Sequence, residues 1–180
     1  MPAIPYKPSA EAGPADVVDP IIARRGGKLL NIDRMLLHSV PLTVGWGALL
    51  GKVRNEFCVV PKIRELAICA VSAFCGAEYE MHHHGDVFLK AGGTPAQFNA
   101  LRNLREAMLM EKIFSPLERA VLQLSFEMTR NVRVPQTLLS TLRNELGDTQ
   151  LVELVGIIAT YNMVARFVVS LGVDVEGNSA

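Results

Sequence analysis

Two short segments of this 180-residue chain carry the same signal for the start of a helix. Thr94-Pro95-Ala96-Gln97 and Ser115-Pro116-Leu117-Glu118 each place a hydroxyl residue before a proline, with Gln or Glu three positions after the hydroxyl. The hydroxyl can accept a hydrogen bond from the first turn while the later side chain bonds back, which forms a capping box. The two segments therefore predict helices that end near Met110 and Thr129.

The other long segments are also helical in pattern. Pro61 suits the first position of a helix, and residues 63–74 are apolar almost all round. Gly147 and Gly172 are expected to end the last two helices. The expected helices cover residues 38–55, 61–74, 77–91, 94–110, 115–129, 135–146 and 148–171. Because no alternating strand pattern is bounded by turn residues, we predict an all-α fold, a compact and oligomeric bundle of about seven to eight helices.

Proline divides the N-terminal part from the rest. Half of the ten prolines lie in the first twenty residues, a density that argues against regular helix and predicts an extended arm over residues 1–28. The arm is expected either to be disordered or to wrap a neighbouring subunit. It ends in the basic segment 24–28, which is either a solvated turn or an anion contact. A single helical domain should cover residues 29–175, followed by a flexible tail over 176–180.

Charge and cysteine content limit the classes of function. Lys+Arg and Asp+Glu both number 18, so nothing favours a nucleic-acid partner or an anionic membrane surface. No apolar run approaches the ~20 residues that span a bilayer, and the start lacks a signal-peptide core. The three cysteines are an odd number without metal-ligand spacing, which favours a reducing compartment. We expect a cytoplasmic protein.

Glu80 and His84 interrupt an apolar helix face. At about 100° per residue, both project among the apolar residues of segment 77–91. Burial of a carboxylate or an imidazole costs several kcal/mol unless the group is paired. This pair is therefore the strongest indication of function in the sequence.

Glu65 is the only acid between residues 63 and 74. It is either an acid that stabilises the helix dipole at a partly exposed end or a member of the same site. A helical hairpin turning at Cys75 and Gly76 would bring it to Glu80 and His84. An imidazole near two carboxylates is suited to deliver or remove a proton near neutral pH.

The three consecutive histidines resemble a metal site, but helix geometry argues against one. Side chains at positions 82, 83 and 84 point about 100° apart on one helix, so they cannot all reach one ion. His82 and His83 are expected to face solvent. A metal held by Glu65, Glu80 and His84 is an alternative, but we expect no metal and no other cofactor.

Three polar residues interrupt the apolar last helix. Tyr161, Asn162 and Arg166 would need specific partners if buried. They either line the pocket or build a subunit interface. Cys69 and Cys75 face different sides of their helix and are interpreted as small core residues.

The residues now described resemble a known superfamily. Arg64-Glu65-Leu66-Ala67, then Glu78-Tyr79-Glu80-Met81 with His84, then Lys90-Ala91-Gly92 are similar to the carboxymuconolactone decarboxylase-like superfamily, which includes the alkyl hydroperoxidase D type of peroxidase. The resemblance covers roughly residues 30–173 and is most specific between 61 and 93. It implies an all-helical homo-oligomer, commonly a trimer or a hexamer, with sites near subunit contacts.

The peroxidase pattern lacks its sulfurs here. The resemblance puts its glutamate on Glu65 and its histidine on His84, but its two redox cysteines fall on Ala77 and Glu80. The chain therefore resembles a branch of the superfamily without a Cys-x-x-Cys motif, and dithiol peroxidase activity is not expected. The decarboxylase pattern keeps Glu65 and His84. The decarboxylases lack the Glu-Tyr-Glu run that this chain has before the histidine. They also have a Gly-Phe-Pro type sequence where this chain has residues 162–167.

The resemblance implies a cofactor-independent lyase or isomerase for a small carboxylated or carbonyl substrate. In a decarboxylation of this type, His84 as imidazolium would protonate the carbon, Glu80 would orient the ring and Glu65 would tune its charge. Arg24 or Arg166 is the candidate for the substrate carboxylate.

Further candidate substrate-binding residues are Tyr79, Tyr161 and Asn162. One alternative function is a non-catalytic oligomeric binding or assembly protein whose Glu80–His84 pair is structural. The other is an alkyl hydroperoxidase-like antioxidant enzyme that uses Cys69 or Cys75.

Overall fold

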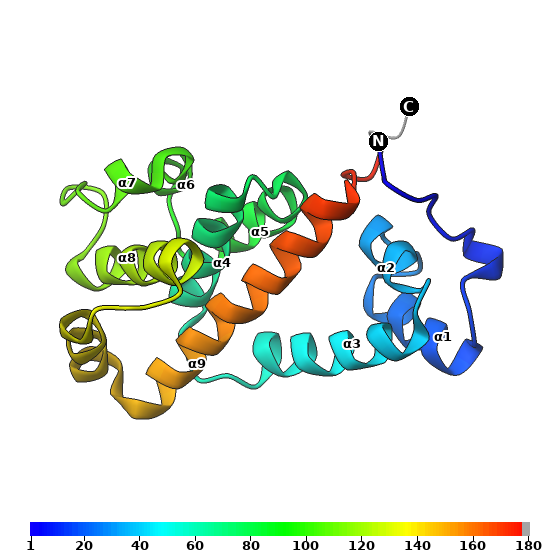
Figure 1. Cartoon of the computed structure of the whole chain (residues 1–180), viewed down its shortest axis with the longest axis horizontal. Helices are drawn as coiled ribbons and strands as arrows, with labels where there is room; N and C mark the ends of the chain where they lie inside the picture. Colours follow the sequence, from blue (N-terminus) through cyan, green and yellow to red (C-terminus); the bar gives the residue numbers. More distant parts are fainter. Residues whose placement is uncertain (178–180) are drawn as a thin grey trace.

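All regular secondary structure is helical in the computed structural model, which describes residues 1–177 and contains no strand within them. The predicted all-α class is confirmed. Short 3-10 helices lie at Ser9–Glu11 (η1) and Leu101–Asn103 (η2). The α-helices (Figure 1) are α1 (Ala15–Arg24), α2 (Asn31–Leu36), α3 (Val40–Asn55), α4 (Pro61–Cys75), α5 (Glu78–Lys90), α6 (Pro95–Ala100), α7 (Leu104–Ala107), α8 (Pro116–Asn131) and α9 (Gln136–Leu171).

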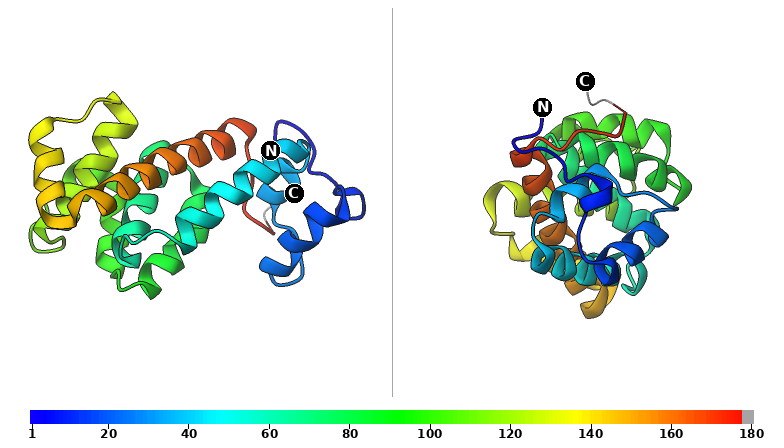
Figure 2. Two further views of the ribbon diagram at one scale, coloured as in Figure 1. Left: turned by 90° about the horizontal axis from the view of Figure 1, so that it is seen from below. Right: turned by 90° about the vertical axis from the view of Figure 1, so that its right-hand side faces the viewer.

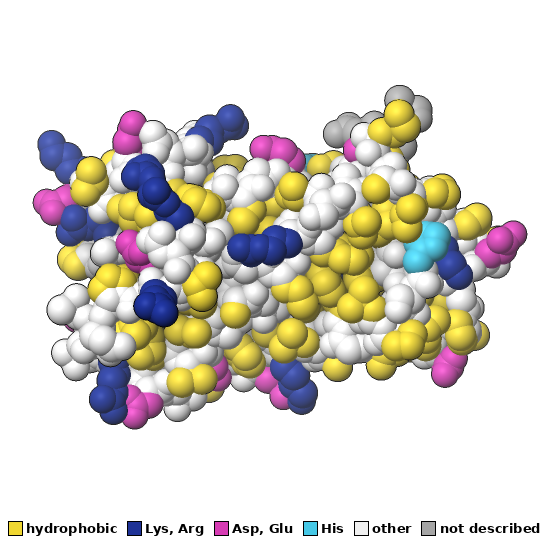
Figure 3. Space-filling model, viewed as in Figure 1, with side chains coloured by type: hydrophobic (Ala, Val, Ile, Leu, Met, Phe, Trp, Pro, Cys, Tyr) yellow, Lys and Arg dark blue, Asp and Glu magenta, His cyan; other side chains and the backbone are white. Residues whose placement is uncertain are grey.

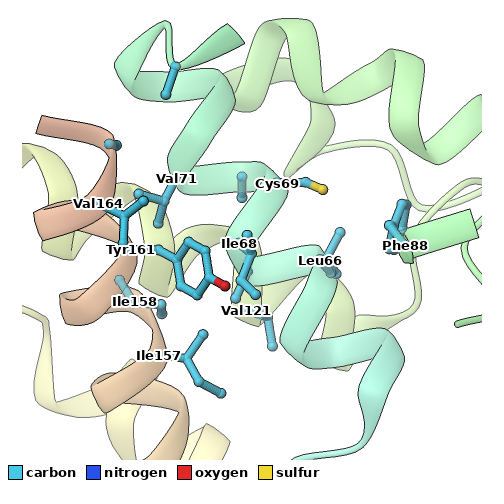
Figure 4. Packing of buried hydrophobic residues seen from close by; sticks show 14 of the residues in the cluster. Leu66, Ile68, Cys69, Val71, Phe88, Val121, Ile157, Ile158, Tyr161 and Val164 are labelled. Carbon is cyan, nitrogen blue, oxygen red and sulfur yellow. The ribbon is translucent and has the colours of Figure 1, made fainter. Parts of the chain in front are cut away.

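Helix α4 is the centre of the bundle. It packs against α5, α8 and α9, so it meets protein on most of its circumference. Leu66 and Ile68 of α4 are fully buried, as are Ile157 and Val164 of α9, and Figure 4 shows these residues packed together. Each such side chain contributes about 1.5–3 kcal/mol by leaving water. This placement explains why residues 63–74 are apolar almost all round.

Both predicted capping boxes are present. The backbone N–H of Gln97 donates to Thr94 Oγ1 at 3.1 Å, and the N–H of Glu118 donates to Ser115 Oγ at 3.2 Å. The reciprocal bonds run from the backbone N–H of Thr94 and of Ser115 to the later side chains. The helix predicted to reach Met110 is interrupted, however, because Asn103 leaves helical geometry and caps α7.

Gly147 acts as predicted. Its φ of 76° and ψ of 172° lie outside helical geometry, so α9 is two helices joined at a kink. Gly172 ends the second half in the left-handed conformation, at a φ of 62°. Among the described helices, α9 alone is long and apolar enough to cross a membrane by length and composition. That is weak evidence, because α9 packs against α4 and α8 as a core helix does.

The prediction that the proline-rich arm forms no regular helix is wrong for residues 15–24. They form α1 although Pro20 lies inside it. Proline within a helix removes one backbone hydrogen bond, at about 3 kcal/mol. The helix forms because Val18 of α1 packs with Leu29, Leu37 and Ala12 in a small core separate from the main one.

The first residues of the chain pack against the segment that follows α9, beside this small core (Figure 2). The backbone N–H of Ala3 donates to the carbonyl oxygen of Leu171 at 2.8 Å, and that of Asp174 donates to Tyr6 Oη at 2.8 Å. Of the predicted flexible tail, Glu176 has specific partners, since its carboxylate accepts from the backbone N–H of Asn31. Residues 178–180 lie outside the described residues.

Apolar side chains also reach the surface. Leu42, Val44 and Leu49 of α3 and Met163 and Val169 of α9 are exposed. Figure 3 shows apolar side chains gathered on the face that α3 shares with the C-terminal half of α9.

Candidate active site

The hairpin of α4 and α5 brings Glu65 and His84 together. Gly76 makes the turn, and its φ of 65° is a left-handed conformation that glycine adopts without strain. His84 Nδ1 lies 2.7 Å from Glu65 Oε2, and both residues are buried. The contact predicted from the hairpin is therefore present.

Glu80 contacts the other ring nitrogen of His84. Its Oε2 lies 3.4 Å from Nε2, and the Glu80 side chain is 4% exposed. Glu80, which the sequence predicts as the residue that orients the ring, thus contacts it at a longer distance than Glu65 does. The helical i, i+4 spacing brings Glu80 near His84, whereas the packing of α4 on α5 sets the closer contact.

Tyr161 and Arg54 complete the surroundings of Nε2. The Tyr161 hydroxyl lies 3.2 Å from His84 Nε2, and the rings meet edge to face with centroids 5.0 Å apart. Arg54 Nε donates to the same hydroxyl at 3.1 Å. Tyr161 was predicted from the sequence as a candidate, whereas Arg54 was missed.

The carboxylates control the protonation of the ring. Burial alone would lower the pKa of His84, but hydrogen bonds to Glu65 and Glu80 and the charges of both carboxylates outweigh burial and raise it. Burial alone would raise the pKa of Glu65, but His84 and then Arg64, whose Nε donates to Glu65 Oε1 at 3.1 Å, lower it. Glu65 therefore stays ionised and favours an imidazolium.

A cavity of about 340 Å³ opens beside this group. Apolar side chains form part of its wall, and three arginines face it from different elements. Its lining residues are Arg25, Leu30, Ile32, Trp46, Arg54, Asn55, Arg64, Glu65, Tyr79, Glu80, His83, His84 and Val87. The three predicted catalytic residues thus lie on one cavity.

The predicted substrate-binding residues are divided between this cavity and other places. Tyr79 lines it, whereas Tyr161 is fully buried, does not line the cavity and contacts His84. Arg24 lies 4.0 Å from Asp33 and does not line the cavity, whereas its neighbour Arg25 does.

Asn162 and Arg166 lie elsewhere. The Asn162 amide donates to Thr129 Oγ1 of α8, and Arg166 bonds back to Asn162 on the exposed side of α9. The expectation that these two residues line the pocket is not met.

Tyr79 and His83 form the part of the cavity wall that contacts Glu176. The Tyr79 hydroxyl donates to Glu176 Oε1 at 2.8 Å, and His83 Nε2 lies 2.9 Å from Glu176 Oε2. The prediction of a solvent-facing side chain holds for His82, which is exposed, and is wrong for His83, which Glu176 holds half-buried.

The geometry disfavours both a metal ion held by Glu65, Glu80 and His84 and a reactive cysteine thiolate. Glu65 and Glu80 contact opposite nitrogens of the His84 ring, so the three groups do not converge on one point, and no metal-binding cluster occurs in residues 1–177. Burial raises the pKa of the Cys69 and Cys75 thiols, which disfavours the nucleophilic thiolate.

Comparison with known proteins agrees with this fold. Residues 59–125 match the Carboxymuconolactone decarboxylase family. The chain superposes on an uncharacterized peroxidase-related protein from Silicibacter sp. TM1040 with a TM-score of 0.81 and 18% identity, over 98% of this chain and 95% of that one. It also superposes on an alkylhydroperoxidase AhpD core, an uncharacterized peroxidase-related protein from Ralstonia eutropha JMP134. That superposition has a TM-score of 0.82 and 18% identity, over 98% of this chain and 93% of that one.

A search of the curated proteins gave no significant match. The match over residues 59–125 and the shared fold agree with the resemblance to the carboxymuconolactone decarboxylase-like and alkyl hydroperoxidase D-like superfamily. Where the peroxidase pattern has its two cysteines, this chain has Ala77 and Glu80.

Proposed function

We propose that this protein is a cofactor-independent lyase or isomerase that acts on a small carboxylated or carbonyl compound through acid–base chemistry at His84. One observation carries the proposal: a buried imidazole, held by Glu65 at 2.7 Å, borders a cavity that three arginines also line. A buried charged pair adds little to fold stability compared with apolar packing, so its presence beside a cavity favours a functional role.

The cavity suits an anionic substrate with an apolar body. Arg25, Arg54 and Arg64 supply guanidinium groups, which bind carboxylates in planar, paired hydrogen bonds. Trp46 and Ile32 supply an apolar wall. The arginines that the structure offers for the carboxylate thus replace Arg24 and Arg166.

Proton transfer is assigned to His84 Nε2. The short bond from Glu65 fixes Nδ1, whereas Nε2 has only the longer contacts to Tyr161 and Glu80, so Nε2 can exchange a partner for substrate. When the C–C bond to the carboxylate breaks, CO2 leaves and the electron pair remains in a dienolate. The Nε2 proton then passes to the carbon, and a proton taken up from solvent, which the loss of CO2 from a carboxylate consumes overall, restores the imidazolium.

The proposal includes assembly and location. We infer that the protein is a homo-oligomer, a trimer or a hexamer, because α3 exposes Leu42, Val44 and Leu49 and the C-terminal half of α9 exposes Met163 and Val169. We place it in the cytosol, the compartment that three unpaired cysteines favour.

The test is a panel of lactone and β-keto acids assayed for CO2 release with the wild type, His84→Asn and His82→Asn. An amide cannot titrate near neutral pH, so His84→Asn should lose activity by about 10²-fold or more. His82 is exposed, so His82→Asn should leave the rate of CO2 release nearly unchanged. Full activity in His84→Asn refutes the assignment. A collapse of melting temperature in His84→Asn, with no turnover in the wild type, favours the assembly function instead.

A further inference from the structure

The Tyr161 hydroxyl has two neighbours that fix the direction of its proton. Arg54 Nε donates to the phenol oxygen at 3.1 Å, and a guanidinium keeps its protons at all ordinary pH values. The hydroxyl's own proton is therefore free for His84 Nε2, 3.2 Å away. Tyr161 is fully buried, so water does not compete for this bond.

The two nitrogens of His84 have different tasks. Glu65 holds Nδ1 as a hydrogen-bond donor at 2.7 Å, so the neutral ring has its lone pair on Nε2. That lone pair can accept from Tyr161. The charged ring instead carries a proton on Nε2 and can donate it to Glu80 Oε2 at 3.4 Å. Neutral and charged His84 thus have different partners at the same nitrogen.

We propose that Arg54 and Tyr161 are a positioning pair that stabilises neutral His84, protonated on Nδ1, and so opposes the two carboxylates. Its part in turnover rests on the proposed function: an acid must give up its proton as well as hold it, and Tyr161 stabilises the ring that has given up its proton. The pair itself acts on His84 whether or not a substrate is known.

The groups that face the ring determine whether each variant favours the charged or the neutral form of His84. They are Glu65 with Arg64 behind it from α4, Glu80 from α5, and Tyr161 with Arg54 behind it from α9 and α3. Cys69 of α4 stays a neutral thiol because burial raises its pKa. Both carboxylates favour the imidazolium. The phenol proton favours the neutral ring, and the Arg54 charge disfavours a second positive charge nearby.

The test is a titration of the histidine ring signals by NMR on the free protein. The chain has four histidines, and comparison with His84→Asn identifies the signal of His84. Tyr161→Phe should raise its midpoint by about one pH unit, a tenfold change in the neutral fraction, as expected for one lost hydrogen bond.

Tyr79→Phe is the matched control. It also loses a phenol hydroxyl beside the cavity, but that hydroxyl donates to Glu176, so the His84 midpoint should stay unchanged. An unchanged or lowered midpoint in Tyr161→Phe, in a protein that melts as the wild type does, overturns the proposal.

A second variant separates the roles within the pair. Arg54→Gln should also raise the midpoint, and it should have a smaller effect when added to Tyr161→Phe, because part of its action passes through the phenol. If Arg54→Gln shifts the His84 midpoint equally in the wild type and in Tyr161→Phe, Arg54 does not act through Tyr161, and that part of the proposal is overturned. Absence of CO2 release from every tested acid would refute the proposed function without changing these midpoints, so the two failures are distinguishable.

Discussion

Replacement of Glu65 by glutamine tests the central contact of the site. Glutamine has nearly the same shape, and its amide oxygen can still accept from His84 Nδ1. It lacks the negative charge, however, and its amide nitrogen would face the Nε–H of Arg64, so two donors would oppose each other.

The size of the effect follows from burial. The Glu65 side chain is 3% exposed, so its 2.7 Å bond to His84 is a charge-assisted bond out of water, worth about 1.5–3 kcal/mol. Arg64 is 15% exposed and can bond water instead, which limits the further loss. We expect Glu65→Gln to lower the free energy of unfolding by about 2–3 kcal/mol in total, a fall in Tm of roughly 4–10 °C.

The loss should depend on pH. The pKa of His84 is raised in the folded state, so its stabilisation is complete below the unfolded value of 6.5 and disappears as pH rises through the folded value. The pKa of Glu65 is lowered, so its stabilisation is present above 4.5 and disappears as pH falls through the folded value. The difference between wild type and variant should therefore be largest between pH 4.5 and 6.5 and smaller at pH 9.

Urea unfolding at pH 6 and pH 9 measures this difference, with equal m-values as the check that both proteins unfold in the same way. Glu78→Gln, which removes an exposed acid from the first turn of α5, is the control and should change stability by under about 0.5 kcal/mol. A loss below that size in Glu65→Gln, or one that grows from pH 6 to pH 9, would refute the reasoning.

Three further predictions concern packing, chemistry and assembly. Gly93→Ala should destabilise by about 1–3 kcal/mol in urea unfolding, because its methyl group would lie 2.5 Å from the fully buried Phe88 ring. Gly156→Ala, whose nearest neighbour lies at 3.7 Å, should instead stabilise by up to about 1 kcal/mol. Organic hydroperoxide should not be turned over with a lipoyl-type dithiol, and turnover that disappears in Cys75→Ser would contradict this. Light scattering at micromolar concentration should give a multiple of the 19.7 kDa chain mass, and a monomeric mass would refute assembly.

Much of the fold could be predicted because its signals are local. The capping boxes at Thr94 and Ser115 and the break at Gly147 depend on residues a few positions apart. Helical periodicity also placed Glu80 and His84 on a buried face. The arm was predicted wrongly because proline density is a local signal, whereas α1 is stabilised by packing on Leu29 and Leu37.

The site was less predictable, because its contacts cross the fold. Arg54 and Tyr161 lie 107 residues apart, and only the packing of α3 beside α9 brings them together. Asn162 and Arg166 lie about 100° and 140° around the helix from Tyr161. Three polar residues close in sequence thus point to different places, and periodicity alone does not show which of them contacts His84.

The two separate cores have a consequence for how the cavity opens. The free energy of a local opening depends on the apolar contacts it breaks, and the core around Val18 is much smaller than the one around α4. Backbone amides of α1 should therefore exchange with deuterium through smaller openings than those of α4. Arg25, which directly follows α1, lines the cavity, whereas Leu30 and Ile32 of its wall pack with the main core. A fluctuation that detaches α1 would therefore remove one part of the cavity wall and admit solvent and solute to His84 while the α4–α5 hairpin stays folded.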